Sequence, residues 1–150
     1  MNLNIMFNLA YPKIEYYLYN YEKLTNRINN INEQNEDLDY NHFNYGMWIK
    51  TKKNRGDSLE NQVVNKINNE CIVVKLNVWK KLLTDVLKHF KETDTLKYKF
   101  IIYKYIKKIS IEEIEQKLNI DKYEQRDIKA EILHYIFLLC VKKNVLREVI

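Results

Sequence analysis

The chain has 150 residues, of which 46% are apolar, and it carries a formal net charge of +5 with only 2 Gly and 1 Pro. This length predicts one domain, or a small domain with a long helical extension. So few Gly and Pro residues exclude a β protein with many tight turns, and they also exclude a Gly-rich phosphate-binding loop. We therefore expect an all-α protein with long helices.

Lys, Asn, Ile and Tyr together supply 70 of the 150 residues, and all four have A/T-rich codons. Genome composition alone can thus explain the excess of Lys. The placement of charge is more informative, because residues 1–74 have 8 basic and 9 acidic side chains, whereas residues 75–150 have 17 basic and 11 acidic ones. A basic C-terminal half favours a polyanionic partner, although Lys-rich helix faces are often only solvated.

The two cysteines, Cys71 and Cys140, are far apart in apolar surroundings. We expect both to be buried free thiols in a reducing, cytoplasmic compartment. The first residues lack the basic segment of a signal peptide, and no apolar stretch has the roughly 18 residues that a membrane span needs. A membrane is therefore not an expected partner.

Apolar residues at alternating steps of three and four predict a coiled-coil-like helix over residues 13–38, beginning near Pro12. The stripe consists of Ile14, Tyr17, Tyr21, Leu24, Ile28, Ile31, Asn35 and Leu38. It packs either on another helix of the same chain or on a second copy as a homodimer, and the first arrangement is our preferred hypothesis.

Residues 39–57 contain both glycines and the basic residues Lys50, Lys52, Lys53 and Arg55, so they predict a connector. A second long helix should follow over residues 58–92. Its expected apolar stripe consists of Leu59, Val63, Ile67, Cys71, Val74, Val78, Leu82, Val86 and Phe90. The β-branched residues near Ile72 leave a kink open as an alternative.

Three shorter helices are expected at about 95–108, 111–118 and 122–143, which places a helix-turn-helix domain at residues 93–150 after a helical region at 1–92. Ser110 and Glu113 form a capping box, Asn119 suits a left-handed turn, and Asp121 caps the last helix. The residues expected to build this motif are Ser110, Glu113, Ile114, Leu118, Asn119, Ile120 and Asp121.

The first turns of the last helix carry the candidate DNA-binding residues. They are Lys122, Tyr123, Gln125, Arg126 and Lys129. Lys and Arg bind phosphate, Arg also bonds guanine, and Gln bonds adenine. Tyr123 offers a hydroxyl to phosphate and a ring to a thymine methyl group. The alternative is a solvated basic face on an ordinary three-helix bundle.

The segment YKFIIYKYIKKISIEEIEQKLNIDKYEQRDIKAEIL resembles the helix-turn-helix of phage late-gene transcription regulators of the ArpU and RinA type, which in turn resemble the −35-reading region of sigma-70 factors. The resemblance extends over most of the chain as a pattern. It implies an activator of phage or prophage genes that binds double-stranded DNA, with RNA polymerase as a further partner. The chain departs from the pattern at Glu115, Asn119 and Gln125, where a small residue, Gly and an apolar residue are usual.

No catalytic residues, metal ligands or cofactor-binding motif stand out. His42, His89 and His134 are scattered, and we expect His134 to be a partly buried core residue. Glu124 and Asp127 place negative charge near the expected DNA surface, which opposes phosphate binding. Two other hypotheses therefore stay open. One is a helical adaptor or oligomerisation protein, and the other is a DNA-binding packaging component similar to small terminase subunits.

Overall fold

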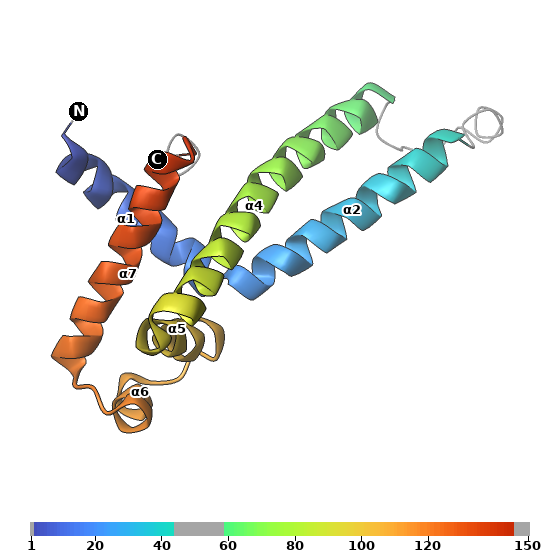
Figure 1. The fold of residues 1–150 in the computed structure, drawn as a ribbon. Helices are drawn as coiled ribbons and strands as arrows, with labels where there is room; N and C mark the ends of the chain where they lie inside the picture. The colour runs from blue at the N-terminus through green and yellow to red at the C-terminus, as the bar shows by residue number, and fades with distance from the viewer. Residues whose placement is uncertain (1, 44–58, 146–150) are drawn as a thin grey trace. The chain divides into compact units, whose positions relative to one another are not determined.

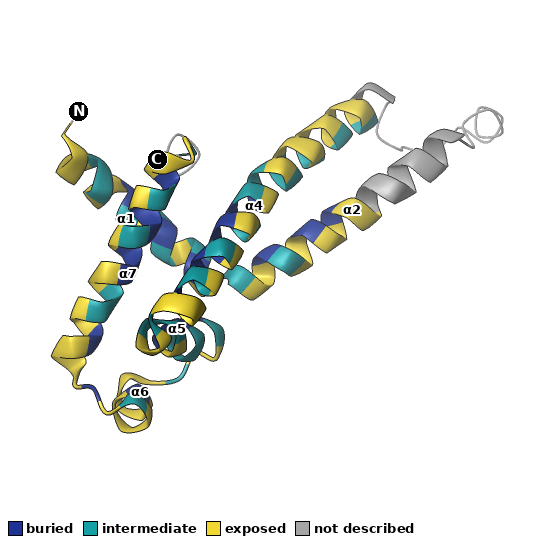
Figure 2. Ribbon diagram, viewed as in Figure 1, coloured by how far each residue is buried: buried dark blue, intermediate teal, exposed yellow. Residues whose placement is uncertain are grey.

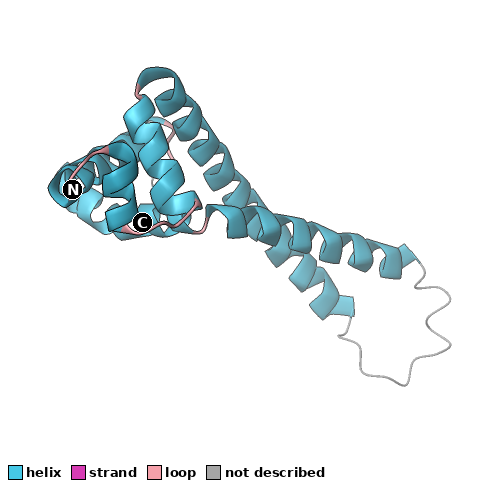
Figure 3. Cartoon of the chain, turned by 90° about the horizontal axis from the view of Figure 1, so that it is seen from below, coloured by secondary structure: helices cyan, strands magenta, loops and turns pink. Residues whose placement is uncertain are grey.

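The computed structural model describes residues 2–43 and 59–145, with side chains described at 2–33 and 61–145. Every regular element in these ranges is helical (Figures 1 and 3). The elements are α1 (Leu3–Tyr19), α2 (Tyr21–Phe43), α4 (Leu59–Thr93), α5 (Thr95–Ile101), the π-helix η1 (Ile102–Ile106), α6 (Ile111–Leu118) and α7 (Lys122–Lys142). The all-α expectation is confirmed. The basic run expected in the connector lies outside the described residues.

The chain divides into two compact units, and the first combines the two ends of the sequence. Unit 1 consists of Met1–Leu24 and Trp79–Ile150, and unit 2 is Thr25–Val78. The boundary expected at residues 92 and 93 is therefore not where the structure divides. Local periodicity does not reveal this division, because α1 joins the C-terminal helices only by packing on them.

The core of unit 1 forms where α1 packs along α7 and η1. Phe7 lies edge-to-face with Phe137, with ring centroids 5.4 Å apart, and Tyr17 stacks on Trp79 at 4.2 Å. Figure 2 shows the buried positions on the facing sides of these helices. The fully buried large side chains of this unit are Ile14, Trp79, Leu82, Leu83, Phe100, Ile101, Tyr105, Ile114, Ile132, Leu133, Ile136 and Phe137.

The N-terminal helix differs from its expected limits at both ends. It begins at Leu3, capped by Asn2, so that Pro12 lies inside α1 instead of in its first turn. It ends at Tyr19, and Asn20 separates it from α2, with the Asn20 side chain donating a hydrogen bond to the Tyr16 carbonyl at 2.8 Å. The predicted stripe is thus divided between two helices.

The two parts of that stripe still face inward. Ile14 and Leu24 are buried in unit 1, and Ile28 and Ile31 are buried in unit 2. Tyr17 and Tyr21 are half-buried, and the side chains of Asn35 and Leu38 lie outside the described residues. Packing within the chain therefore covers the described part of the stripe, as our preferred hypothesis expected.

Helix α4 runs without interruption from Leu59 to Thr93, but its apolar stripe is not buried throughout. Leu82, Val86 and Phe90 are buried in unit 1, whereas Val63, Ile67 and Val74 are exposed in unit 2. In unit 2 the buried side of the helix is another one, which carries Leu76, and α2 runs along α4 in Figure 1 and crosses it in Figure 3. Cys71 is exposed, which corrects the expectation of a buried thiol.

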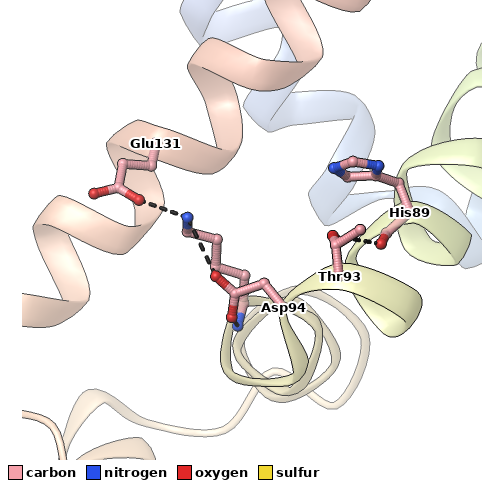
Figure 4. A network of polar contacts seen from close by, with 5 residues as sticks. His89, Thr93, Asp94 and Glu131 are labelled. Atoms are coloured by element: carbon pink, nitrogen blue, oxygen red, sulfur yellow. Dashed lines mark hydrogen bonds and ion pairs between the residues drawn. The ribbon is translucent and has the colours of Figure 1, made fainter.

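The connection from α4 to α6 contains two changes of helix geometry. Asp94 caps α5, and Lys97 bridges Asp94 and Glu131 of α7, at 3.3 and 2.6 Å, beside the bond from Thr93 to the His89 carbonyl (Figure 4). The chain then widens into η1 and turns at Lys108, which has a left-handed φ of 54°. These contacts fix where α6 begins relative to α7.

Among the described residues, no helix is both long and apolar enough to cross a bilayer.

Pro12 provides a test of the α1 geometry. Proline has no N–H, so the carbonyl of Asn8 receives no helical hydrogen bond, and Pro12 itself is exposed. We expect Pro12→Ala to raise the free energy of unfolding by roughly 1–3 kcal/mol, as measured by urea denaturation. A less stable variant would show that unit 1 depends on the backbone geometry that proline gives α1.

Candidate nucleic-acid interface

The candidate site is built from α6, the three-residue turn 119–121 and the start of α7. Ser110 caps α6 by accepting the N–H of Glu113 at 3.2 Å, which is one of the two hydrogen bonds of the predicted capping box. Asn119 then takes the left-handed conformation, with φ 53° and ψ 47°, and Ile120 is buried behind it. In Figure 1, α6 is seen nearly end-on while α7 is seen along its length, so the two helices cross steeply.

Asp121 and Glu124 fix the first turn of α7 through a reciprocal capping box. The Asp121 carboxylate accepts the N–H groups of Tyr123 and Glu124, each at 2.8 Å, and Glu124 accepts the Asp121 N–H at 2.9 Å. The sequence predicted the cap at Asp121. One consequence is that these amides are already bonded, so a phosphate at this helix end would have to be bound by side chains instead.

Gln125 is not a DNA-facing residue, which corrects the sequence-based expectation. Its side chain is only 4% exposed, and its Nε2 donates to the carbonyl of Ile111 at 3.0 Å and to that of Ile120 at 3.5 Å. It therefore links α7 to the start of α6 and to the turn. The usual apolar residue would fill this position, but an amide additionally bonds two backbone carbonyls.

Three of the predicted residues are presented to solvent at the same end of α7. Tyr123 is 58% exposed, and the cations of Lys122 and Arg126 lie 5.1 and 5.9 Å from its ring centroid. Arg126 has a contact of 3.8 Å with Asp127, but both side chains are largely exposed, so this pair holds Arg126 only weakly. The group consists of one aromatic ring and two exposed cations, and we call it the Tyr123 cluster.

Lys129 lies apart from the Tyr123 cluster, because its side chain is directed toward α1. Its Nζ lies 2.7 Å from Glu15 Oε1, which also accepts a hydrogen bond from the Tyr105 hydroxyl at 3.3 Å. Burial lowers the pKa of Lys129, but its hydrogen bond to Glu15 and the Glu15 charge outweigh burial and hold the pKa above its ordinary value. The pKa of Tyr105 is also raised, in this case by burial together with the Glu15 charge. Lys129 is thus part of the packing between α1 and α7.

The structure also adds a pair of cations that the sequence analysis did not single out. Lys107, at the end of η1, and Lys117, in the last turn of α6, lie 5.3 and 5.5 Å from the ring centroid of Tyr103. Their separation along the chain gave no pattern to detect. Both side chains are exposed, so they add positive charge beside α6.

The exposed surface of α6 and early α7 carries acidic residues as well. Glu112, Glu113 and Glu115 of α6 are exposed, and Glu124 and Asp127 of α7 are too. Ile111 is 49% exposed, so it does not join the buried face that Ile114 makes, and Leu118 is half-buried. The positive charge at this site is therefore confined to particular side chains and does not form a general field.

The remaining titratable groups of the described residues do not form a second site. No group of three or more His, Cys, Asp or Glu residues among them is arranged to hold a metal ion. His89 stacks on Tyr135 at 4.4 Å, and His134 is exposed and lies edge-to-face with Phe7, which corrects its expected partial burial. His42 lies among the residues whose side chains are not described.

No protein-family model, curated protein or solved structure was found to match the chain. The functional argument therefore rests on the residues of the site and on their resemblance to a known motif.

Gln125 can be tested by comparing two substitutions of similar size. Gln125→Met keeps the volume but removes the donor, and we expect it to lower the free energy of unfolding by about 1 kcal/mol. Gln125→Glu places a carboxylate against the two carbonyls, so it should cost more, roughly 2–4 kcal/mol at pH 7. Urea denaturation of both variants checks the order, and equal stabilities would contradict the anchoring role.

Proposed function

We propose that the chain is a DNA-binding transcriptional regulator that contacts duplex DNA through the first two turns of α7. The observation that carries this proposal is the Tyr123 cluster, in which two exposed cations flank an exposed ring at the start of a helix. The α6–turn–α7 segment supports it, because the second helix of such a motif enters the major groove with its N-terminal residues. The resemblance to phage late-gene regulators leads to the same proposal.

The side chains divide the work of binding in a defined way. The first-turn amides of α7 are bonded to Asp121, so Lys122 supplies a phosphate contact and Tyr123 supplies a hydroxyl or a ring face. Arg126 lies one turn farther along the helix, and its planar guanidinium suits the guanine O6 and N7 atoms. Gln125 contributes indirectly, since it holds α7 at the angle that exposes these three residues.

The acidic residues of the site predict moderate affinity. Glu124 is held in the capping box, where its charge faces the positive end of the helix dipole. Asp127 stays exposed near Arg126 and opposes phosphate binding. Lys107 and Lys117 offset part of this repulsion by adding cations beside α6. Activation of transcription through RNA polymerase belongs to the same proposal.

The double variant Lys122→Ala/Arg126→Ala tests the proposal on folded protein. Removing a side chain that binds phosphate should flatten the slope of log K against log salt by about 0.9, and removing one that binds a base should cost about 1–3 kcal/mol on a preferred site. Titration of random, A/T-rich and G-containing duplexes at two salt concentrations measures both effects, and the duplexes with guanine report the contact of Arg126. Thermal stability should not change, because both side chains are exposed.

Lys129→Ala is the matched control, because it removes a cation from the same helix but outside the Tyr123 cluster. We expect it to lower the free energy of unfolding by about 1 kcal/mol because the ion pair with Glu15 is lost, with the salt slope unchanged. If the double variant binds DNA as wild type does, α7 is not the DNA-contacting element. The adaptor hypothesis would then lead.

A further inference from the structure

Helix α4 has a second apolar face in unit 2 that its packing on α2 leaves uncovered. Val64, Ile67 and Val74 are 49%, 53% and 64% exposed, Cys71 is exposed and Val78 is half-buried. These residues follow one another at steps of three, four, three and four. We call them the α4 seam, and Figure 2 shows exposed positions along this part of the helix.

The α4 seam has the spacing of a two-stranded coiled coil. Val64, Cys71 and Val78 occupy the first apolar position of successive heptads, usually labelled a, and Ile67 and Val74 occupy the second, labelled d. Leu76 falls on the opposite side of the helix, at position f, and it is buried. The helix therefore has one face for α2 and another with the geometry for a partner helix.

We propose that the α4 seam binds a second copy of this chain, with the two α4 helices parallel. The charges beside the seam favour this occupant. Glu70 lies at position g and Lys75 at position e of the following heptad, and in a parallel dimer each g residue faces that e residue of the partner. A parallel dimer with a twofold axis therefore places two Glu70–Lys75 pairs across the interface. In an antiparallel pair, Glu70 and Lys75 do not face each other.

The apolar residues of the seam have the spacing of a coiled coil but do not by themselves choose the number of helices. Val at position a is typical of parallel dimers, whereas β-branched residues at position d, here Ile67 and Val74, are more typical of higher oligomers, so the charge pairing carries the choice of a second copy. Val63, 45% exposed at the other flank, extends the apolar surface. A solvated patch of five neighbouring apolar residues is unfavourable in a monomer, so burying it contributes to association.

The helix is already formed before association, which lowers the cost of binding. A separate peptide with two heptads would be too short to form a stable helix in water. Here the described packing of Leu76, Ile28 and Ile31 in unit 2 supports α4 on its other face. The seam is only about 21 Å long at 1.5 Å per residue, so we expect a dimer that dissociates within the micromolar range.

Sedimentation equilibrium tests the dimer on the full chain at about 1 to 200 μM. This range brackets the affinity expected for preformed helices. The mass should rise with concentration toward twice the 18.3 kDa of one chain. Ile67→Asp should weaken the dimer at least tenfold without loss of helical circular dichroism, because Ile67 is exposed in the monomer. Asn65→Asp is the matched control. It adds the same charge to an exposed position of α4 outside the seam and should keep the wild-type dimer.

A monomeric wild type over the whole range would overturn the proposal. So would an Ile67→Asp variant that dimerises as wild type does.

Cys71 lies at the middle of the seam and reports whether the two seams meet, and a cysteine introduced at position 64 reports whether the helices are parallel and in register. A short bismaleimide should link Cys71 to the Cys71 of the second copy, and Cys71→Ser should abolish this link. Cys140 should not react, because it is buried and burial raises the pKa of its thiol to about 12. In a Cys71→Ser background, Val64→Cys should restore the link and Asn65→Cys should not. Equal linking at the latter two positions would overturn the proposed register.

The flanking charges give a third test. Glu70→Lys and Lys75→Glu should each weaken the dimer several-fold, since each places like charges together at both flanks. The double exchange should restore wild-type affinity. A double variant as weak as either single one would overturn the parallel pairing. None of these measurements depends on DNA binding, so failure of the dimer and failure of the proposed function can be distinguished.

Discussion

The packing of α1 along α7 is the contact on which the rest of unit 1 depends. It joins the first twenty residues to the last described helix, and it buries Ala10, Ile14 and Leu18 against the C-terminal core. Removing apolar surface from water supplies most of the stabilisation at such an interface. Glu15 and Lys129 add a directed contact at its edge, where the carboxylate also accepts the Tyr105 hydroxyl. This arrangement keeps α7 in one place while leaving its first turns exposed.

The start of α7 is held by polar contacts in which each group has a distinct role. Asn119 turns the chain, Asp121 satisfies the first amides of the helix, and Gln125 binds the carbonyls of Ile111 and Ile120. Because a buried N–H group without an acceptor is costly, the bonds of the Gln125 Nε2 specify one angle between α6 and α7 and disfavour others, while the Gln125 Oε1 is buried without a partner. Lys122, Tyr123 and Arg126 are presented by this frame. The proposed DNA contact thus depends on residues that would never touch DNA.

Helix α4 combines two requirements that compete for the same apolar residues. Toward its C-terminal end, Trp79, Leu83 and Phe90 are buried in unit 1, while in unit 2 the side with Leu76 faces α2. The α4 seam stays exposed, because α2 covers only one side of α4 in unit 2. A sequence without any further partner would be expected to place polar residues there. Their absence indicates a partner helix, and the positions of Glu70 and Lys75 beside the seam are the reason for assigning that helix to a second copy.

The sequence by itself determined the all-α class, the limits of α4, α6 and α7, and the capping residues Ser110, Asn119 and Asp121. These features depend on local physics, since helix periodicity, capping and left-handed turns involve residues only a few positions apart. The prediction that Lys122, Tyr123 and Arg126 face solvent was also correct, because the helical period places them away from the apolar face.

Tertiary structure alone decided the burial of Gln125, the turn of Lys129 toward Glu15 and the joining of Met1–Leu24 to the C-terminal helices. It also decided which part of the α4 stripe is covered. The helical period shows that residues share a face, but only the packing of distant segments determines what covers that face.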